Sequence, residues 1–155
     1  AEEPQRLNGQ AGLFTAFEVL ERLFDPRTFL NQAREVCLPG GILVLTTTTC
    51  SGFEYQILGA HAPNLNPPDR LNLFSIETLT RMLEECGFEL LELSTPGRLD
   101  VEIVRKTLEA NPELPVSSFW RYFFQHRGEG ARHSLQEFLQ QYQLSSHVRV
   151  AARKG

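Results

Sequence analysis

Apolar residues along the chain gather in four short runs that predict β-strands. Leu13 to Phe17 and Ile42 to Thr47 offer little polar face, which is typical of buried strands. Phe88 to Ser94 is the third predicted strand. The fourth, His147 to Arg153, alternates apolar and polar residues, which suits a half-exposed or antiparallel strand.

Helical periodicity separates these runs. Asp25 and Pro26 are typical of a helix start, and the stripe that follows consists of Phe29, Leu30, Ala33, Val36 and Cys37. Pro39 is expected to end this helix, and Gly40 and Gly41 to form the turn into the next strand. Ser75 is the expected cap of a second helix, which ends at Gly87.

The rest of the chain is predicted to hold a loop and a helical insertion. Residues 51–73 are expected to be loop-rich, because adjacent prolines at their centre disfavour regular structure. Three helices are predicted before the last strand: Asp100 to Ala110, Ser118 to His126, and Ser134 to Tyr142, which opens with a capping box. Strands alternating with helices indicate an α/β protein. We expect one domain, with residues 1–11 as a flexible lead and residues 98–143 as a helical insertion or cap.

Composition adds little to this interpretation. The 155 residues are 41% hydrophobic and 22% charged, which is ordinary for one globular domain. No apolar run is long enough to span a membrane, and the polar N-terminus does not resemble a signal peptide, so a cytoplasmic location is expected. Cys37, Cys50 and Cys86 lack the spacing of a zinc site and are expected to be buried thiols.

Three segments, in this order, resemble the class I S-adenosylmethionine-dependent methyltransferases. AFEVLERLFDPRTFL resembles the end of the family's fourth strand and the helix after it, and VCLPGGILVLTT resembles its Pro-Gly-Gly turn and fifth strand. NPPDRLNLFSIETLTRMLEECGFE resembles a later helix that ends in Gly-Phe. The resemblance implies a partial Rossmann-like sheet of about four strands, the last antiparallel, flanked by helices.

The resemblance implies S-adenosylmethionine as cofactor and a small-molecule methyl acceptor, and it covers the C-terminal half of the family's domain. The family's glycine-rich cofactor loop has no counterpart in this sequence. Phe17 and Glu18 are the cofactor contacts that carry over, and they are not expected to form a pocket, or to bind the cofactor, alone. Catalytic residues are not identified by the resemblance.

Several positions near the expected active-site rim differ from the family pattern. Arg22 and Arg70 stand where relatives commonly have histidine, and four threonines, Thr46 to Thr49, replace Thr-Thr-Pro-Asn. Some relatives bind a divalent metal through Glu-x-x-Glu-His, which Glu18, Glu21 and Arg22 resemble. Arginine has no free lone pair for a metal. We therefore expect no metal, and interpret Glu18 and Glu21 as rim carboxylates paired with the arginines.

Two further segments carry candidate chemistry. His61 and Asp69 flank the proline loop, where a general base could reach an acceptor, although a lone loop histidine is usually just solvated. The helix from Ser118 to His126 interleaves aromatics with arginine, as single-stranded nucleic acid platforms do. The acidic net charge of −4 favours a cap or a buried helix over nucleic acid.

Two functions follow from the sequence. The first is the C-terminal part of a methyltransferase acting on an unidentified small molecule, not catalytic as this isolated chain. The second is a degenerate, non-catalytic module for protein–protein interaction. In that case the strand at residues 13–17 would be an exposed sheet edge, and we expect a homo-oligomer or a partner chain to pair with it, or with the aromatic helix.

Overall fold

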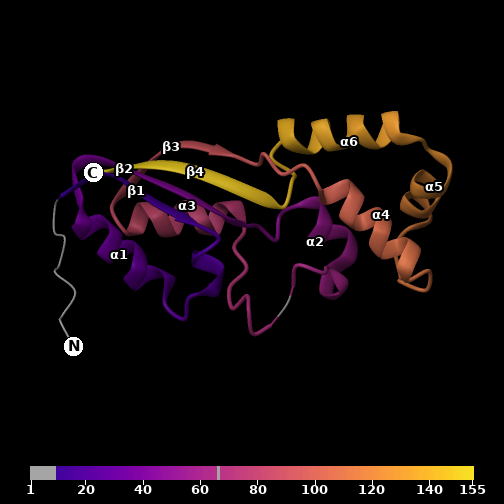
Figure 1. Ribbon diagram of the computed structural model, residues 1–155, viewed down its shortest axis with the longest axis horizontal. Coiled ribbons are helices and arrows are strands. Elements are labelled where there is room, and N and C mark those ends of the chain that lie inside the picture. The colour runs from indigo at the N-terminus through magenta and orange to yellow at the C-terminus, as the bar shows by residue number, and fades with distance from the viewer. Residues whose placement is uncertain (1–9, 66) are drawn as a thin grey trace.

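A computed structural model describes residues 10–65 and 67–155 of the chain. Most of the expected flexible lead, residues 1–11, lies outside the described residues, and Ala11 already belongs to the first strand. Figure 1 shows an elongated molecule, with the β-sheet and two helices at one end and a group of helices at the other. No helix of the described ranges is long and apolar enough to cross a membrane.

Four strands form one mixed sheet in the order β1-β2-β4-β3. The strands are β1 (Ala11–Phe17), β2 (Cys37–Thr48), β3 (Phe88–Ser94) and β4 (His147–Lys154). β1 and β2 are parallel, whereas β4 runs antiparallel to both β2 and β3. This arrangement confirms the predicted partial Rossmann-like sheet with an antiparallel last strand.

The Pro-Gly-Gly segment lies inside a strand and not in a separate turn, which corrects the expectation. β2 begins at Cys37, and its pairing jumps from Ala11–Cys37 to Leu13–Ile42, so the extra residues bulge out of the ladder. A Cβ atom at Gly41 would lie 3.0 Å from the carbonyl oxygen of Ala11. The glycine is therefore needed because the neighbouring backbone approaches so closely.

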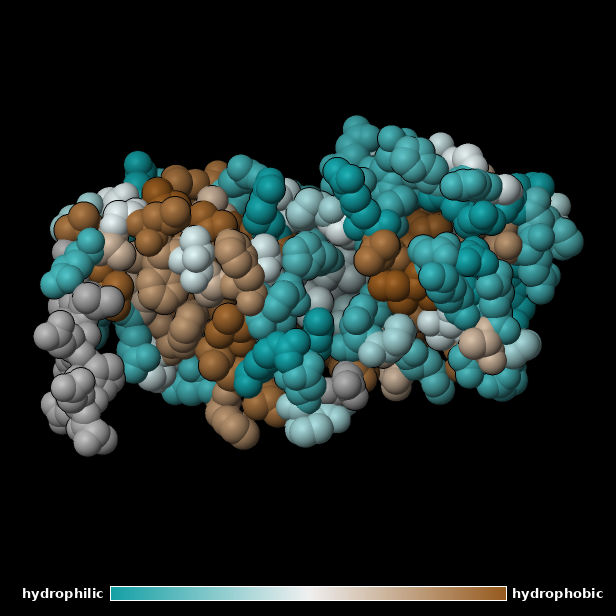
Figure 2. All heavy atoms as spheres, viewed as in Figure 1, coloured by the Kyte–Doolittle hydropathy of each residue, from teal (hydrophilic) through white to brown (hydrophobic). Residues whose placement is uncertain are grey.

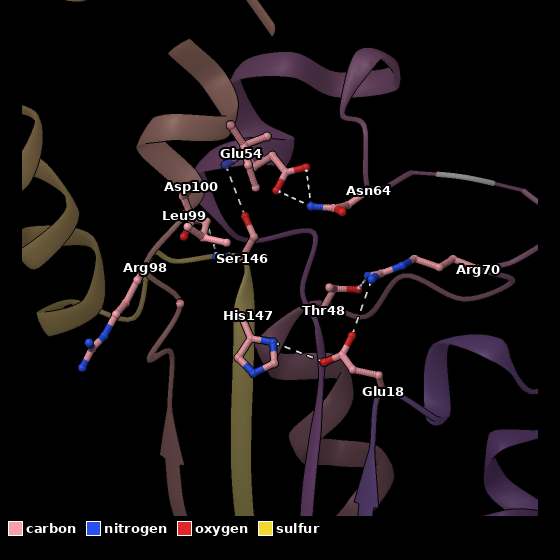
Figure 3. A pocket seen from close by; sticks show the side chains of 12 residues that line it. Glu18, Thr48, Glu54, Asn64, Arg70, Arg98, Leu99, Asp100, Ser146 and His147 are labelled. Carbon is pink, nitrogen blue, oxygen red and sulfur yellow. Dashed lines mark hydrogen bonds and ion pairs between the residues drawn. The ribbon is translucent and has the colours of Figure 1, made fainter. Parts of the chain in front are cut away.

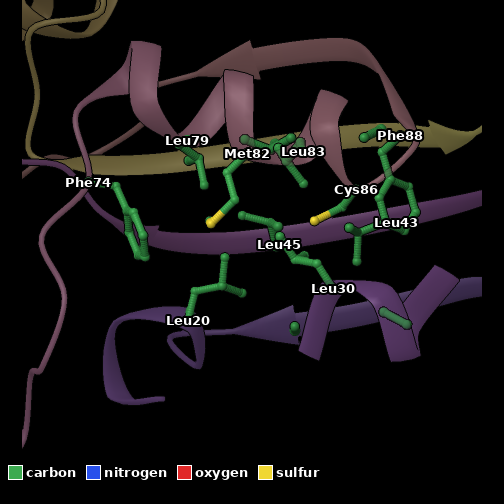
Figure 4. Close-up of a cluster of buried hydrophobic side chains, with 14 of the residues drawn as sticks. Leu20, Leu30, Leu43, Leu45, Phe74, Leu79, Met82, Leu83, Cys86 and Phe88 are labelled. Atoms are coloured by element: carbon green, nitrogen blue, oxygen red, sulfur yellow. The ribbon is translucent and has the colours of Figure 1, made fainter. Parts of the chain in front are cut away.

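The main hydrophobic core lies between one face of the sheet and two helices, α1 (Pro26–Val36) and α3 (Ile76–Glu85). Both helices begin as predicted: the side chains of Asp25 and Ser75 accept hydrogen bonds from the backbone N–H groups of Thr28 and Thr78. Figure 4 shows the buried side chains that meet there, which include Leu30, Leu43, Leu45, Leu79, Leu83 and Phe88.

The opposite face of the sheet is open. Leu13 and Phe17 of β1 are each 59% exposed. On the neighbouring strands, Arg149 and Arg153 of β4 form ion pairs with Glu92 and Glu89. β1 is also an edge strand of the described sheet, so both its outer edge and this face are accessible.

A second hydrophobic cluster joins the remaining helices at the far end of the molecule. These helices are α2 (Phe53–Leu58), which is followed by a short 3₁₀ turn at Gly59–His61, α4 (Asp100–Ala110), α5 (Ser118–His126) and α6 (Glu129–Gln141). A second 3₁₀ turn, Leu20–Arg22, follows β1 and packs its Leu20 into the main core. Figure 2 shows a largely hydrophilic surface over this end and apolar side chains gathered over the sheet end. The aromatic helix α5 buries Phe124 and leaves Phe119 and Tyr122 exposed.

Three predictions about this region and the cysteines need correction. α6 begins at Glu129 and is preceded by Gly128, so Ser134 lies within the helix and caps nothing. The segment predicted as loop-rich contains α2. This helix is only six residues long and has no clear apolar stripe, so the sequence pattern does not predict it. Of the three free thiols, Cys37 and Cys86 are buried, but Cys50 is only half-buried.

Candidate functional site

A pocket of about 360 Å³ lies where β1 and β2 end and β4 begins. Because β4 is antiparallel, its first residues reach the same edge of the sheet as the last residues of β1 and β2. Helices α2 and α4 form the other side of the pocket (Figure 3). The lining side chains that matter below are those of Glu18, Thr48, Glu54, Arg70, Asp100 and His147.

Glu18 joins three segments at the mouth of this pocket. It follows β1 with a positive φ of 54°, an uncommon value for a residue with a side chain. Its Oε1 lies 3.2 Å from Nδ1 of His147 and accepts a hydrogen bond from Thr46, and its Oε2 lies 3.5 Å from Arg70. The hydrogen bond with His147, aided by the charges of His147 and Arg70, lowers the pKa of Glu18 to about 2.

Glu21 is fully buried beneath this site. Its Oε2 accepts a hydrogen bond of 2.7 Å from the Thr47 hydroxyl, and its Oε1 has no hydrogen-bond partner. Burial raises the pKa of Glu21, and the neighbouring Glu18 raises it further. The pKa values of the two carboxyl groups therefore move in opposite directions, and Glu21 is the more readily protonated of the two.

The two arginines have different partners. Arg70 donates a hydrogen bond of 2.7 Å to Thr48 and pairs with Glu18, as expected for a rim carboxylate. Arg22 pairs instead with Asp69 at the surface, and its Nε donates to the backbone carbonyl of Glu18. No ion pair of the described residues joins Glu21 to either arginine, which corrects the expectation for that residue. In the described parts of the chain, no group of three His, Cys, Asp or Glu side chains is placed to hold a metal ion.

The other predicted site residues do not line the pocket. Phe17 is exposed on the open side of β1, and His61 is exposed in a 3₁₀ turn. Asp69 is held by its ion pair with Arg22. Of the seven candidates from the sequence, only Glu18 and Arg70 reach the pocket, with Glu21 directly beneath.

Besides Arg98, sequence reasoning did not find three ionisable residues of the pocket, Glu54, Asp100 and His147. Glu54 of α2 is 1% exposed, and both its carboxylate oxygens accept hydrogen bonds from Asn64. Asp100 of α4 is 3% exposed and accepts from the hydroxyl of Ser145 and the backbone N–H of Ser146, each at 2.5 Å. His147 is expected from the sequence as the start of the last strand and not as a site residue. None of the three belongs to a spaced motif, and only tertiary structure brings them together.

The sheet order and the position of the pocket define a methyltransferase-type α/β fold. The family model described as a methyltransferase domain matches residues 1–93, which is more than half of the chain. The chain therefore belongs to this methyltransferase family. No curated protein sequence matches it.

Solved structures with a similar fold include methyltransferases. A geranyl diphosphate methyltransferase, solved with GPP and sinefungin, has a TM-score of 0.59 and 16% identity, over 99% of this chain and 50% of its own. A possible histamine N-methyltransferase of Thermotoga maritima has a TM-score of 0.54 and 16% identity, over 96% of this chain and 57% of its own. The cyclase SpnF has a TM-score of 0.53 and 18% sequence identity, over 95% of this chain and 50% of its own. The chain thus spans about half the length of these structures, and at such identities the likeness concerns the fold.

The family implies S-adenosylmethionine as cofactor, a molecule with a cationic sulfonium centre. The carboxylate that follows β1 belongs to Glu18, and its two oxygens are already engaged by His147, Thr46 and Arg70. Phe17 is 59% exposed and stands outside the pocket. The residues described here therefore do not by themselves fit the cofactor, although they can form one wall of its site.

Proposed function

We propose that this chain is the C-terminal part of an S-adenosylmethionine-dependent methyltransferase that acts on a small-molecule acceptor. The observation that carries the proposal is the pocket between the sheet edge and helices α2 and α4. In open α/β sheets, ligands bind outside the carboxyl ends of the parallel strands. The pocket occupies this position, and membership of the family supports methyl transfer as its use.

In this proposal the chain provides the acceptor side of the active site. Glu18 and Phe17 would form one wall of the cofactor site, and helices α2 and α4 would enclose the acceptor. Holding two reactants together in the right geometry is worth roughly 7–11 kcal/mol of a reaction barrier. The isolated chain is not expected to catalyse the reaction, because its described residues do not complete the cofactor site. Its unpaired cysteines suit a reducing compartment such as the cytoplasm.

A second function is supported by the exposed edge of the sheet. β1 has an open outer edge and two apolar side chains, Leu13 and Phe17, that are more than half exposed. Such an edge is a template for pairing with another strand. A non-catalytic interaction module would use it to bind a partner chain or a second copy of this protein.

Calorimetric titration with S-adenosylmethionine and its demethylated product separates the two functions. We expect no binding by this chain alone, and binding by a longer chain extended upstream by a strand and a glycine-rich loop. Absence of binding by the longer chain would refute the enzymatic proposal. Sedimentation tests the second function: a concentration-dependent dimer that Phe17→Glu abolishes supports it, and a compact monomer at high concentration contradicts it.

A further inference from the structure

We infer that Glu18 and His147 act as a carboxylate–imidazole pair, in which the second ring nitrogen of His147, Nε2, takes the proton of a phenol bound in the pocket. The inference rests on the proposed function and deepens it, because such a phenol would be the methyl acceptor. Three observations carry it: a carboxylate whose position is fixed, an imidazole held against it at the pocket wall, and a ring nitrogen with no partner among the described residues.

Glu18 is held in place through both its backbone and its side chain. Its backbone N–H donates to the carbonyl of Thr46 at 2.9 Å, and its own carbonyl accepts from Nε of Arg22 at 3.1 Å. Its carboxylate accepts from the hydroxyl of Thr46 at 3.3 Å and lies 3.5 Å from Arg70. A non-glycine residue with a φ of 54° persists where its surroundings fix it, and such residues cluster at functional sites. The carboxylate is therefore a fixed acceptor for its neighbour on β4.

His147 is that neighbour, and the contact decides which of its ring nitrogens is free. The residue pairs with Thr48 of β2 and lines the pocket, and its Nδ1 lies 3.2 Å from Oε1 of Glu18. Glu18 is ionised at neutral pH, because its pKa is about 2. An ionised carboxylate can only accept, so in the neutral ring Nδ1 carries the proton and Nε2 has a free lone pair. Figure 3 shows the contact at one ring nitrogen and none at the other.

No other charged group of the pocket competes for Nε2. Besides the pair itself, the charged side chains that line the pocket are those of Glu54, Arg70, Arg98 and Asp100. Within the described ranges, none of these four forms an ion pair or a side-chain hydrogen bond with His147. Arg70 pairs with Glu18 instead, so the carboxylate is shared between a guanidinium and the ring. Nε2 therefore remains accessible to a ligand.

The pair sets the chemistry of the ligand. When a phenol hydroxyl meets Nε2, its O–H bond breaks, the electron pair stays on the oxygen, and the proton forms the new N–H bond. The product is a phenolate beside an imidazolium, which the carboxylate of Glu18 stabilises. Proton transfer to a side chain is efficient when the two groups have similar acidity, which favours a phenol over an aliphatic alcohol. Leu99 and Ile103 line the same pocket and supply apolar contacts for the aromatic ring.

The test is titration of the 155-residue chain with 4-nitrophenol, and with 4-nitroanisole as the ether that has no proton to give, followed by absorbance and calorimetry. At a pH where the free phenol is largely un-ionised, we expect binding to produce the absorption band of the phenolate. The ether should bind about tenfold more weakly or worse, the loss expected for a hydrogen bond to a charged group. His147→Gln should abolish the band. His133→Gln removes an exposed imidazole that lies 3.3 Å from Glu137 and should leave band and affinity unchanged.

Glu18 is a positioning residue in this inference, and Glu18→Gln tests that role. Glutamine keeps an acceptor for Nδ1 but removes the charge, so the phenolate band should weaken while binding of the ether is unchanged.

NMR of the labelled imidazole nitrogens in the wild-type chain keeps the test decisive if the variants do not fold. We expect the neutral ring of His147 to carry its proton on Nδ1, and a proton on Nε2 would overturn the inference. So would the absence of phenol binding, equal binding of phenol and ether, or a phenolate band that survives His147→Gln. The outcome is independent of the cofactor titration: a phenolate band here, with a longer chain that ignores S-adenosylmethionine, would leave this inference standing and remove only the proposed reaction.

Discussion

Glu18 and His147 join two strands that are not neighbours in the sheet: Oε1 of Glu18 at the end of β1 lies 3.2 Å from Nδ1 of His147 at the start of β4. β2 runs between them. The contact thus reaches across β2 at the edge that bears the pocket. It also explains why the pKa of Glu18 falls to about 2.

The first prediction concerns acid. Because the pKa of Glu18 in the folded protein lies below its ordinary value of 4.5, its contribution to stability is complete above that value. The contribution is lost as the pH falls from about 4.5 toward 2. We expect Glu18→Gln to lower the free energy of unfolding by about 1 kcal/mol at pH 7, a value reduced for partial exposure. Urea denaturation should show a smaller difference at pH 3. An equal difference at both pH values would contradict the assignment.

The second prediction concerns Glu21, whose pKa moves in the opposite direction. Burial disfavours its charged form, so its contribution to stability is present below the unfolded value of 4.5 and is lost as the pH rises through the raised pKa. Glu21→Gln should therefore gain stability relative to wild type as the pH increases from 4 to 8. Thermal unfolding across this range measures the trend, and a difference that does not depend on pH would exclude it.

A companion variant tests the hydrogen bond to Glu21. Among the described side chains, only Thr47 donates a hydrogen bond to Glu21. Thr47→Val removes this donor and should lower the free energy of unfolding by about 1–3 kcal/mol. Thr47→Ser keeps the hydroxyl and serves as the control. If the serine and valine variants lose the same stability, the cost comes from packing and not from the hydrogen bond.

The third prediction contrasts two glycines. A Cβ atom at Gly52 would lie 2.2 Å from the Cα of Ser146, a backbone clash that no side-chain movement relieves. Gly52→Ala should therefore cost more than about 3 kcal/mol or prevent folding, by the mechanism of overpacking. Gly130 lies in α6 with nothing within 4 Å of the same atom. Gly130→Ala should gain about 0.5–1 kcal/mol from helix propensity. Chemical denaturation measures the free energy of unfolding of both variants. A Gly52→Ala variant as stable as wild type would contradict the prediction.

The fourth prediction compares two serines that precede helices. Ser75 accepts a hydrogen bond of 3.1 Å from the backbone of Thr78, whereas Ser117 before α5 makes no such bond. Ser75→Ala should cost about 1 kcal/mol, and Ser117→Ala should stay within about 0.5 kcal/mol. Melting temperatures at a fixed pH compare the pair directly. Similar losses would mean that the cap bond of Ser75 contributes little.

Local signals in the sequence were sufficient for most of the fold. Phe88 to Ser94 and the helices from Asp100 and Ser118 have the predicted bounds, because periodicity and caps depend on neighbouring residues. α6 was misplaced because Ser134 and Glu137 match a capping box, while Gly128 also suits the N-terminal position. α2 was missed because six residues are too few to show a period.

The site was less predictable than the fold. Glu18 and Arg70 were found through the family resemblance, which places them near the strand ends. Glu54, Asp100 and His147 come from separate elements, and their meeting depends on long-range packing that no local spacing records. The raised pKa of Glu21 depends on burial, which the sequence does not show.

The position of β4 between β2 and β3 also sets the order in which the sheet can form during synthesis. Ile42 pairs with Arg153, and Phe88 with Lys154, so the strand that holds the sheet together is translated long after its two neighbours. A nascent chain that has reached β3 can form local helices but has no partner to join β3 to β2. Such non-local pairing slows folding and leaves strand edges exposed in the meantime. The ribosome must therefore release β4 before the pocket, whose wall includes His147, can exist.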